Sequence, residues 1–195
     1  MTFSPLPPHA AWQHRDSRSG FEVAFFSAAD AGMHCTGCAT AVRGDERWII
    51  DYAIELDAHW HTHRAQVRCR SGASGHPSEV LLASNGHGRW LIDGQPAPHL
   101  DGLIDVDLEA SAFTNTFPIH RLALAVGQSA EAPAAWVRAP GLQVERLEQR
   151  YTRVTDNGEH ARFDYAAPRF DFQSRLVFDR HGLVLEYPGI AVRAA

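Results

Sequence analysis

The segment WIIDYAIELDAHW, residues 48–60, decides the class of fold that this sequence predicts. Its even positions read Trp, Ile, Tyr, Ile, Leu, Ala and Trp, whereas all of its charged residues stand at odd positions. Because successive side chains of a strand point to opposite faces, this period of two predicts a long strand with one face in a core. After Trp60 the apolar side chains move to odd positions, at Ala65, Val67 and Cys69. Such an exchange of faces requires a bulge or tight turn near residues 60–62.

The same alternation recurs at residues 104–108, 122–126, 170–178 and 183–187, and turn sequences rich in Asp, Asn, Ser and Gly separate the runs, at 71–75, 85–88, 93–94, 156–158 and 179–182. These turn residues permit the positive φ of hairpin connections. One segment dissents, because Val144, Leu147, Tyr151 and Val154 also fit helical spacing. The turn that follows them favours a hairpin.

We therefore predict an all-β protein with a single domain over residues 1–195, in which residues 1–10 form a flexible N-terminus. Short connections between about ten to twelve strands indicate an antiparallel sheet that curls into a spiral β-roll or half-barrel.

Composition narrows the function. The chain has 195 residues, 45% of them hydrophobic, and a net charge of -5, which argues against a nucleic-acid partner. All 18 basic residues are Arg, as expected from the composition of a GC-rich genome. No apolar stretch approaches the roughly 20 residues of a membrane span, and the N-terminus lacks the features of a signal peptide. The three Cys argue against a disulfide framework, so we expect a cytoplasmic protein.

Residues 85–122 carry the densest polar chemistry. Asp105 and Asp107 lie two apart on an expected strand, so both side chains face away from the apolar Ile104, Val106 and Leu108. Arg89 or Arg121 is available as an ionic partner. The next loop sets short polar side chains between two aromatic ones: Ser111, Thr114, Asn115 and Thr116 between Phe113 and Phe117. Such combinations are typical of sites that bind a ligand with polar and apolar parts.

Other motifs predict no cofactor and no metal. His59, His61 and His63 alternate, but the exchange of faces falls among them, so we expect them at a rim. Cys35 and Cys38 form a lone C-x-x-C without the strand–helix context of a redox motif. No nucleophile elbow, P-loop or dinucleotide motif occurs, and nothing in the sequence compels an enzyme.

Three segments, GRWLIDG (88–94), LDGLIDVDL (100–108) and FTNTFPI (113–119), resemble the core motif of the putative glycolipid-binding family, first described as a domain of unknown function. Residues 52–60, 148–151 and 179–189 extend the resemblance over nearly the whole chain. It departs at Ala112, where the family usually carries Pro, at His120, where Arg is common, and at His61 and His63, on a rim that is Arg-rich in relatives. The resemblance implies a spiral β-roll whose concave face binds a glycolipid.

Our leading hypothesis is therefore that the concave face binds a glycolipid or another amphipathic small molecule. Ile54 and Leu56 would extend its apolar floor, and the candidate ligand-binding residues are Tyr52, Trp60, Arg89, Trp90, Asp105, Asp107, Thr114, Asn115, Thr116 and Arg121. One alternative is a hydrolase or isomerase that uses Asp105 and Asp107, or a metal on His61 and His63, on a sugar-like or lipid-like substrate. Another is a β-module whose concave face takes a peptide or helix of a partner.

Overall fold

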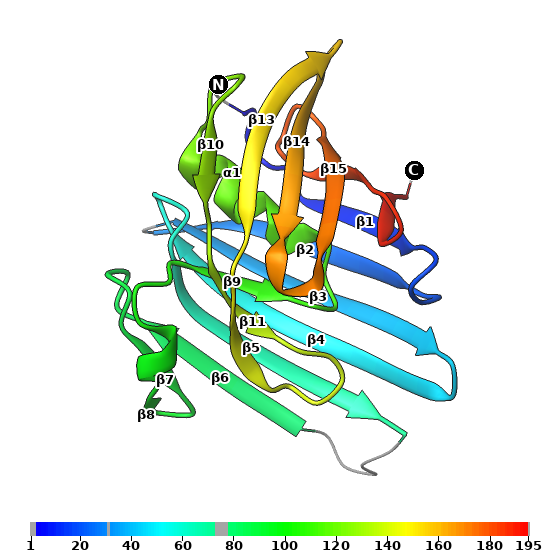
Figure 1. The fold of residues 1–195 in the computed structure, drawn as a ribbon. Helices are drawn as coiled ribbons and strands as arrows, with labels where there is room; N and C mark the ends of the chain where they lie inside the picture. Colours follow the sequence, from blue (N-terminus) through cyan, green and yellow to red (C-terminus); the bar gives the residue numbers. More distant parts are fainter. Residues whose placement is uncertain (1–2, 31, 73–77, 195) are drawn as a thin grey trace.

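The computed structural model describes residues 3–30, 32–72 and 78–194 as a curled antiparallel sheet that wraps around an inner segment (Figure 1). In order of pairing, the strands of the large sheet are β10 (Ser129–Glu131), β13 (Arg150–Asn157), β14 (His160–Ala167), β15 (Phe172–Phe178), β16 (Val184–Tyr187), β17 (Ala191–Arg193), β1 (His9–His14), β2 (Phe21–Ala29), β3 (Gly32–Arg43), β4 (Glu46–Asp57), β5 (Thr62–Ser71), β6 (Ser78–Ser84), β7 (Trp90–Ile92) and β8 (Gln95–Pro96).

A small second sheet and short helices make up the rest. The sheet pairs β12 (Val144–Leu147) antiparallel to β11 (Ala134–Val137), which runs parallel to β9 (Asp105–Leu108). The helices are η1 (Pro98–Leu100), η2 (Phe113–Asn115), α1 (Thr116–Leu122) and η3 (Pro168–Phe170).

The predicted all-β class and curled antiparallel sheet are confirmed, but the predicted number of strands was too low. The described residues form one sheet of fourteen strands and another of three. Strands of two to four residues, such as β7, β8, β10 and β17, are too short to show a period of two in the sequence. The predicted turns near 85–88, 93–94, 156–158 and 179–182 lie between paired strands, whereas 73–75 of the turn at 71–75 lie outside the described residues.

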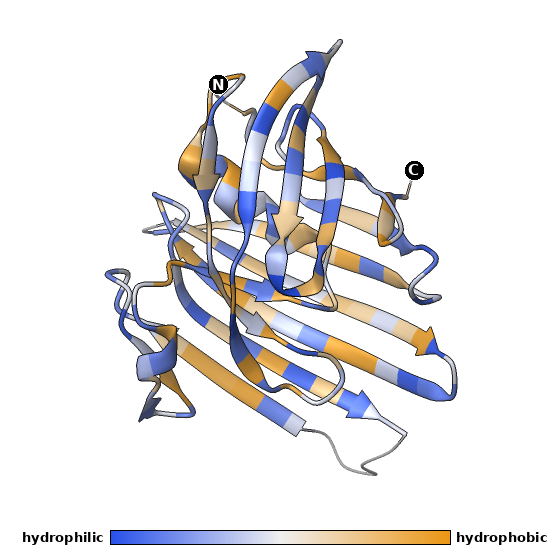
Figure 2. Cartoon of the chain, in the orientation of Figure 1, coloured by the Kyte–Doolittle hydropathy of each residue, from blue (hydrophilic) through white to orange (hydrophobic). Residues whose placement is uncertain are grey.

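β4 follows the predicted alternation: Trp48, Ile50, Tyr52, Ile54 and Leu56 are all buried. Figure 2 shows the resulting bands of polar and apolar residues along the long strands. The exchange of faces falls at the start of β5, where the register shifts: Leu56 pairs with the buried Thr62, but Glu55 pairs with Arg64, and the next buried side chain is Ala65. β4 ends at Asp57, and Trp60 in the following connection adopts a positive φ of 67°, a left-handed conformation that is strained for a bulky side chain.

Two local predictions were wrong. Residues 122–126 were expected to be a strand, but α1 ends at Leu122 and an irregular segment follows. Residues 113–117 were expected to be a loop, but they form η2 and the start of α1. Three alternating apolar positions are too few to separate a strand from an amphipathic helix end, and the buried aromatic rings of Phe113 and Phe117 are held by tertiary packing.

The large sheet has two arms, the first formed by β1–β7 and the second by β13–β16. The inner segment, residues 97–149, lies between these arms and supplies side chains to two cores. Leu100, Val106 and Phe113 pack with β1–β7 in the first core. Ile119 and Leu147 pack with β13–β16 in the second. The inner segment of the protein thus covers the concave face of the first arm. The candidate functional site lies where the inner segment meets both arms.

Candidate functional site

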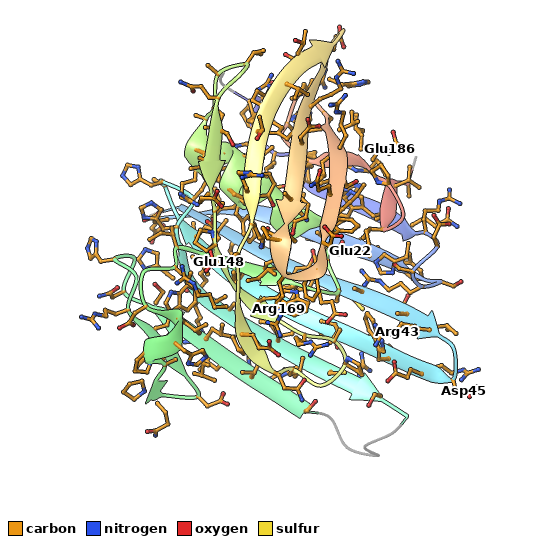
Figure 3. All side chains as sticks on the ribbon, viewed as in Figure 1. Glu22, Arg43, Asp45, Glu148, Arg169 and Glu186 are labelled. Carbon is orange, nitrogen blue, oxygen red and sulfur yellow. The ribbon has the colours of Figure 1, made fainter. Side chains whose placement is uncertain are left out.

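Glu22, on β2, is fully buried in a closed hydrogen-bond cluster (Figure 3). Tyr52 donates its hydroxyl to Glu22 Oε1 at 2.7 Å, and the Ser111 hydroxyl donates to the same oxygen. The backbone N–H of Ala112 donates to Oε2 at 2.8 Å. Burial raises the pKa of Glu22, while these donors lower it. The cluster joins the inner segment to the first arm, and a buried carboxyl group with three donors needs no ligand.

Asp105, on β9, is also sealed. Arg121 from the end of α1 forms a two-pronged ion pair with it, at 3.1 Å from Nε and 2.5 Å from Nη2. The Asp105 side chain is only 2% exposed, so this ion pair closes the carboxylate off from solvent. Burial raises the pKa of Asp105, and Arg121 opposes that rise. A short buried ion pair of this geometry fixes α1 against the small sheet.

Asp107, two residues further along β9, lines an open cavity instead. The hydroxyl of Thr114 donates to its Oδ1 at 2.7 Å, and Gln149 Nε2 donates to its Oδ2 at 2.9 Å. The short helix η2, which carries Thr114, therefore reaches the same side of β9 as this carboxylate. Burial raises the pKa of Asp107 to about 6, and the charges of Asp105 and Glu109 add to the rise. Within the described part of the chain, no Arg or His side chain forms an ion pair with Asp107.

Arg18, in the connection between β1 and β2, lines the same cavity. Its Nε donates to His14 Nδ1 at 3.2 Å and its Nη1 donates to the backbone oxygen of Glu109 at 2.9 Å. Its Nη2 is enclosed and has no hydrogen-bond partner. Among the described residues no carboxylate lies within ion-pair distance of Arg18, and burial lowers its pKa. A buried guanidinium donor without a partner is costly unless something else binds there.

The cavity that these two side chains share, here the Arg18–Asp107 cavity, has a volume of about 270 Å³. Both arms and the inner segment contribute to it, and its wall combines polar groups with aromatic rings. The aromatic residues of the wall are Trp136, Tyr165, Phe170, Phe172 and Tyr187. The rings form two packed groups: the centroids of Tyr165 and Tyr187 lie 5.9 Å apart, and those of Trp136 and Phe170 lie 5.3 Å apart. Convergent polar groups beside aromatic ones are the usual lining of a small-molecule site.

Asn115 is the second predicted candidate that lines the Arg18–Asp107 cavity. Its Oδ1 accepts the hydroxyl of Tyr151 at 2.8 Å, and that hydroxyl also lies 3.1 Å from Gln149 Oε1. Gln149 in turn binds Asp107, so Asn115, Tyr151, Gln149 and Asp107 form one network. The network fixes the polar end of the cavity.

A second cavity, of about 500 Å³, lies elsewhere and shares no lining residue with the first. Trp60 lines it and stacks on His120, with ring centroids 3.8 Å apart. Its other walls are largely apolar, with Phe3, Leu6, Phe26 and Met33. Burial lowers the pKa of His120 to about 4, so the imidazole is neutral, and its Nε2 lies 2.9 Å from the His181 carbonyl oxygen.

The structure does not bring the other predicted candidates to the Arg18–Asp107 cavity. Arg89 is 77% exposed and paired with Asp101. Trp90 is buried and donates to the Leu103 carbonyl oxygen at 2.9 Å. Thr116 is fully buried. Tyr52 belongs to the Glu22 cluster, and Ile54 and Leu56 are buried in the first core.

The histidine and cysteine motifs are peripheral to this site. His61 and His63 each lie 3.4 Å from Asp57 Oδ2, at the connection that follows β4. Across the described residues, no set of three or more His, Cys, Asp or Glu side chains is arranged to hold a metal ion. Cys35 and Cys38 lie on β3, where burial raises the pKa values of their thiols to about 12 and about 11. These thiols are therefore protonated at neutral pH.

Sequence reasoning did not find Arg18, Glu22, Tyr165 or Tyr187. Glu22 left a signal, because it shares parity with the buried Ala24 on β2, and a Glu at an inward position must have partners. Arg18 left none, since it stands in a connection and meets Tyr187 only through the pairing of distant strands.

The fold and the site together define a class: all-β proteins whose open, curled sheet wraps an inserted segment and leaves a small, mixed polar and aromatic cavity at their junction. The family model described as putative glycolipid-binding matches residues 9–193, and the chain belongs to that family. None of the helices within the described ranges has the length and apolar character that a membrane crossing requires.

Solved structures agree with this assignment. A DUF1089 family protein from Pseudomonas aeruginosa is 33% identical, with a TM-score of 0.75 over 89% of this chain and 92% of that chain. A beta-barrel-like protein of the domain of unknown function DUF1849 from Brucella abortus shares the fold at 10% identity, with a TM-score of 0.53 over 97% of this chain and 95% of that chain. No curated protein matches the chain.

Proposed function

We propose that the protein binds an amphipathic molecule with a sugar head group, and that the head group occupies the Arg18–Asp107 cavity. The observation that carries this proposal is the enclosed Nη2 of Arg18, which has no partner although it lies in a cavity wall. A ligand oxygen at this atom would remove the cost of the unpaired donor. The family description supports the same ligand class.

The lining suits a sugar ring. Asp107 and Asn115 offer oxygen acceptors to hydroxyl groups, and the aromatic rings offer flat apolar surfaces to the C–H faces. The volume of about 270 Å³ falls just below the ~300 Å³ at which drug-sized pockets begin, so it fits a head group rather than a whole lipid. Phe170, which is 50% exposed, stands where an alkyl chain would leave the cavity for the surface.

The geometry gives the hydrolase or isomerase alternative less support. It requires Asp105 and Asp107 to act on one substrate, but Arg121 occupies both oxygens of Asp105. Asp105 also does not line the cavity that Asp107 lines. We therefore keep binding, without a chemical step, as the proposed function.

Calorimetric titration with octyl β-D-glucoside, below its micelle concentration, tests the proposal. We expect saturable binding that Phe170→Ala weakens about tenfold, because the ring covers the alkyl chain. The matched control is Phe25→Ala: Phe25 is 54% exposed, like Phe170 at 50%, but lies outside the cavity wall. No binding of any octyl glycoside to the wild-type protein, or equal losses in both variants, would contradict the proposal.

A further inference from the structure

Two of the charged side chains that line the Arg18–Asp107 cavity have no ionic partner among the described residues. Four ionisable groups with a formal charge at neutral pH line it: Arg18, Arg43, Asp107 and Glu109. Arg43 lies 3.5 Å from Glu109 and 2.9 Å from Glu46, and Glu109 also lies 3.8 Å from Arg138, so these two lining residues have ionic partners. Arg18 and Asp107 have none among the described residues.

Within the described part of the chain, no carboxylate accepts a hydrogen bond from Arg18. Two of its donors bind neutral groups, the His14 ring and the carbonyl oxygen of Glu109, and its guanidinium lies 5.7 Å from the centroid of the Trp48 ring. His14 cannot share the charge, because burial lowers its pKa to about 4. The acidic groups that act most strongly on Arg18 are Glu22 and Glu109, and both raise its pKa. The oxygens of Glu22 already accept from Tyr52, Ser111 and Ala112, and the Glu109 carboxylate pairs with Arg43 and Arg138.

From this arrangement we infer that the ligand's head group carries an anionic group, a carboxylate or a phosphate, which Arg18 binds. The inference rests on the proposed function and names the chemical class of its ligand. A guanidinium presents its donors in a planar fork that matches the oxygens of such groups, so a neutral sugar would leave part of that recognition unused.

Asp107 determines how the ligand is oriented in the cavity. It comes from β9, whereas Arg18 comes from the connection between β1 and β2, and the two side chains form no ion pair with each other. An ionised Asp107 repels an anion but accepts hydroxyl groups, because a carboxylate has acceptors only. The acidic group therefore faces Arg18 and the sugar hydroxyls face Asp107.

The test compares two probes with the same alkyl chain, octyl β-D-glucuronide and octyl β-D-glucoside, by calorimetry at pH 7.5 and low salt. We expect the wild-type protein to bind the glucuronide at least about tenfold more tightly, the range of a hydrogen bond to a charged group. Arg18→Gln should weaken the binding of both probes and should bind the two with nearly equal affinity. Arg15→Gln, which removes an exposed positive charge three residues away, should keep the preference.

Each outcome decides between the claims. Equal affinity of the wild type for both probes overturns the inference and leaves the proposed function standing, whereas no binding of either probe overturns both. If Arg18→Gln does not fold, the wild-type comparison and Arg18→Lys decide, since Lys keeps the charge but loses the fork and should show a reduced preference. An undiminished preference in Arg18→Gln or Arg18→Lys overturns the role of Arg18.

Free glucuronate and inorganic phosphate serve as the last arms. Binding of free glucuronate as tight as that of the octyl glucuronide supports the anionic group but assigns it to a soluble acidic sugar instead of a lipid head group. Competition by millimolar inorganic phosphate against the glucuronide, and not against the glucoside, supports the Arg18 site. If phosphate displaces neither probe and the two probes bind equally well, the proposed anion site at Arg18 is overturned.

Discussion

Two sides of the inner segment handle buried charge in opposite ways. In the sealed region, defined by the Glu22 cluster and the Asp105–Arg121 pair, every carboxylate oxygen has a donor from the protein. At the Arg18–Asp107 cavity, both oxygens of Asp107 also accept hydrogen bonds, but the Nη2 donor of Arg18 is left without a partner. Both regions join the inner segment to the sheet. The sealed region shows that such a junction can satisfy all of its hydrogen-bonding groups, so the unpartnered donor of Arg18 is not a requirement of the fold. The difference separates residues that hold the fold from residues that are available to a ligand.

The largest expected effect is on the sealed side. Arg121→Met should lower the free energy of unfolding by about 3–5 kcal/mol, because it leaves Asp105 buried without its cation. Urea denaturation at pH 7 measures the loss. A decrease below about 1 kcal/mol would remove the contrast between the two regions.

The next effect concerns Glu22. Glu22→Ala leaves the donors of Tyr52, Ser111 and Ala112 without an acceptor, and we expect a loss of about 3 kcal/mol in the free energy of unfolding. Glu148→Ala is the control, since the Glu148 side chain is 54% exposed and pairs only with Arg146 at the surface. Equal losses in the two variants would show that the Glu22 cluster does not join the inner segment to β2.

Asp107 should make stability depend on pH. Its pKa is about 6 in the folded protein, whereas an Asp carboxyl group ordinarily has a pKa of 3.8, so the folded state binds the proton more tightly than the unfolded state. Stability is therefore lost as the pH rises from about 4 to about 6, by at most about 3 kcal/mol, since one pKa unit corresponds to about 1.4 kcal/mol. Asp107→Asn should lack this decrease.

Denaturation of both proteins between pH 4 and pH 7.5 checks this prediction. The advantage of Asp107→Asn over the wild type should grow with pH and level off above about 6. A difference in stability that stays constant with pH, or that shrinks as the pH rises, would mean that folding does not raise the pKa of Asp107.

The smallest expected effect repeats the Arg-to-Met substitution on the open side. Arg18→Met should change the free energy of unfolding by no more than about 1 kcal/mol without ligand, because the lost hydrogen bonds are offset by removal of an uncompensated buried charge. Side by side with Arg121→Met, this variant tests the comparison with one residue type. A loss equal to that of Arg121→Met would place Arg18 among the residues that hold the fold.

The sequence predicted the features that depend on local pattern. The alternation over residues 48–60 located β4, its buried face and the turn that follows, because a period of two has a direct structural meaning. The polar residues of 105–115 were recognised as unusual, and Thr114 does bind Asp107. Their division could not be predicted, since Asp105 and Asp107 share one face of β9 and differ only in what the rest of the fold places beside them. Arg18 and Tyr187 meet across 169 positions through the order of strands in the sheet, which one sequence does not specify.

A crystal structure of the protein grown with octyl β-D-glucoside tests the central claim most directly. The account predicts density for the sugar ring in the Arg18–Asp107 cavity, with an oxygen within hydrogen-bond distance of Arg18 Nη2 and the alkyl chain leaving past Phe170. Density for the sugar in the cavity beside Trp60 and His120, with the Arg18–Asp107 cavity empty of ligand, would contradict it.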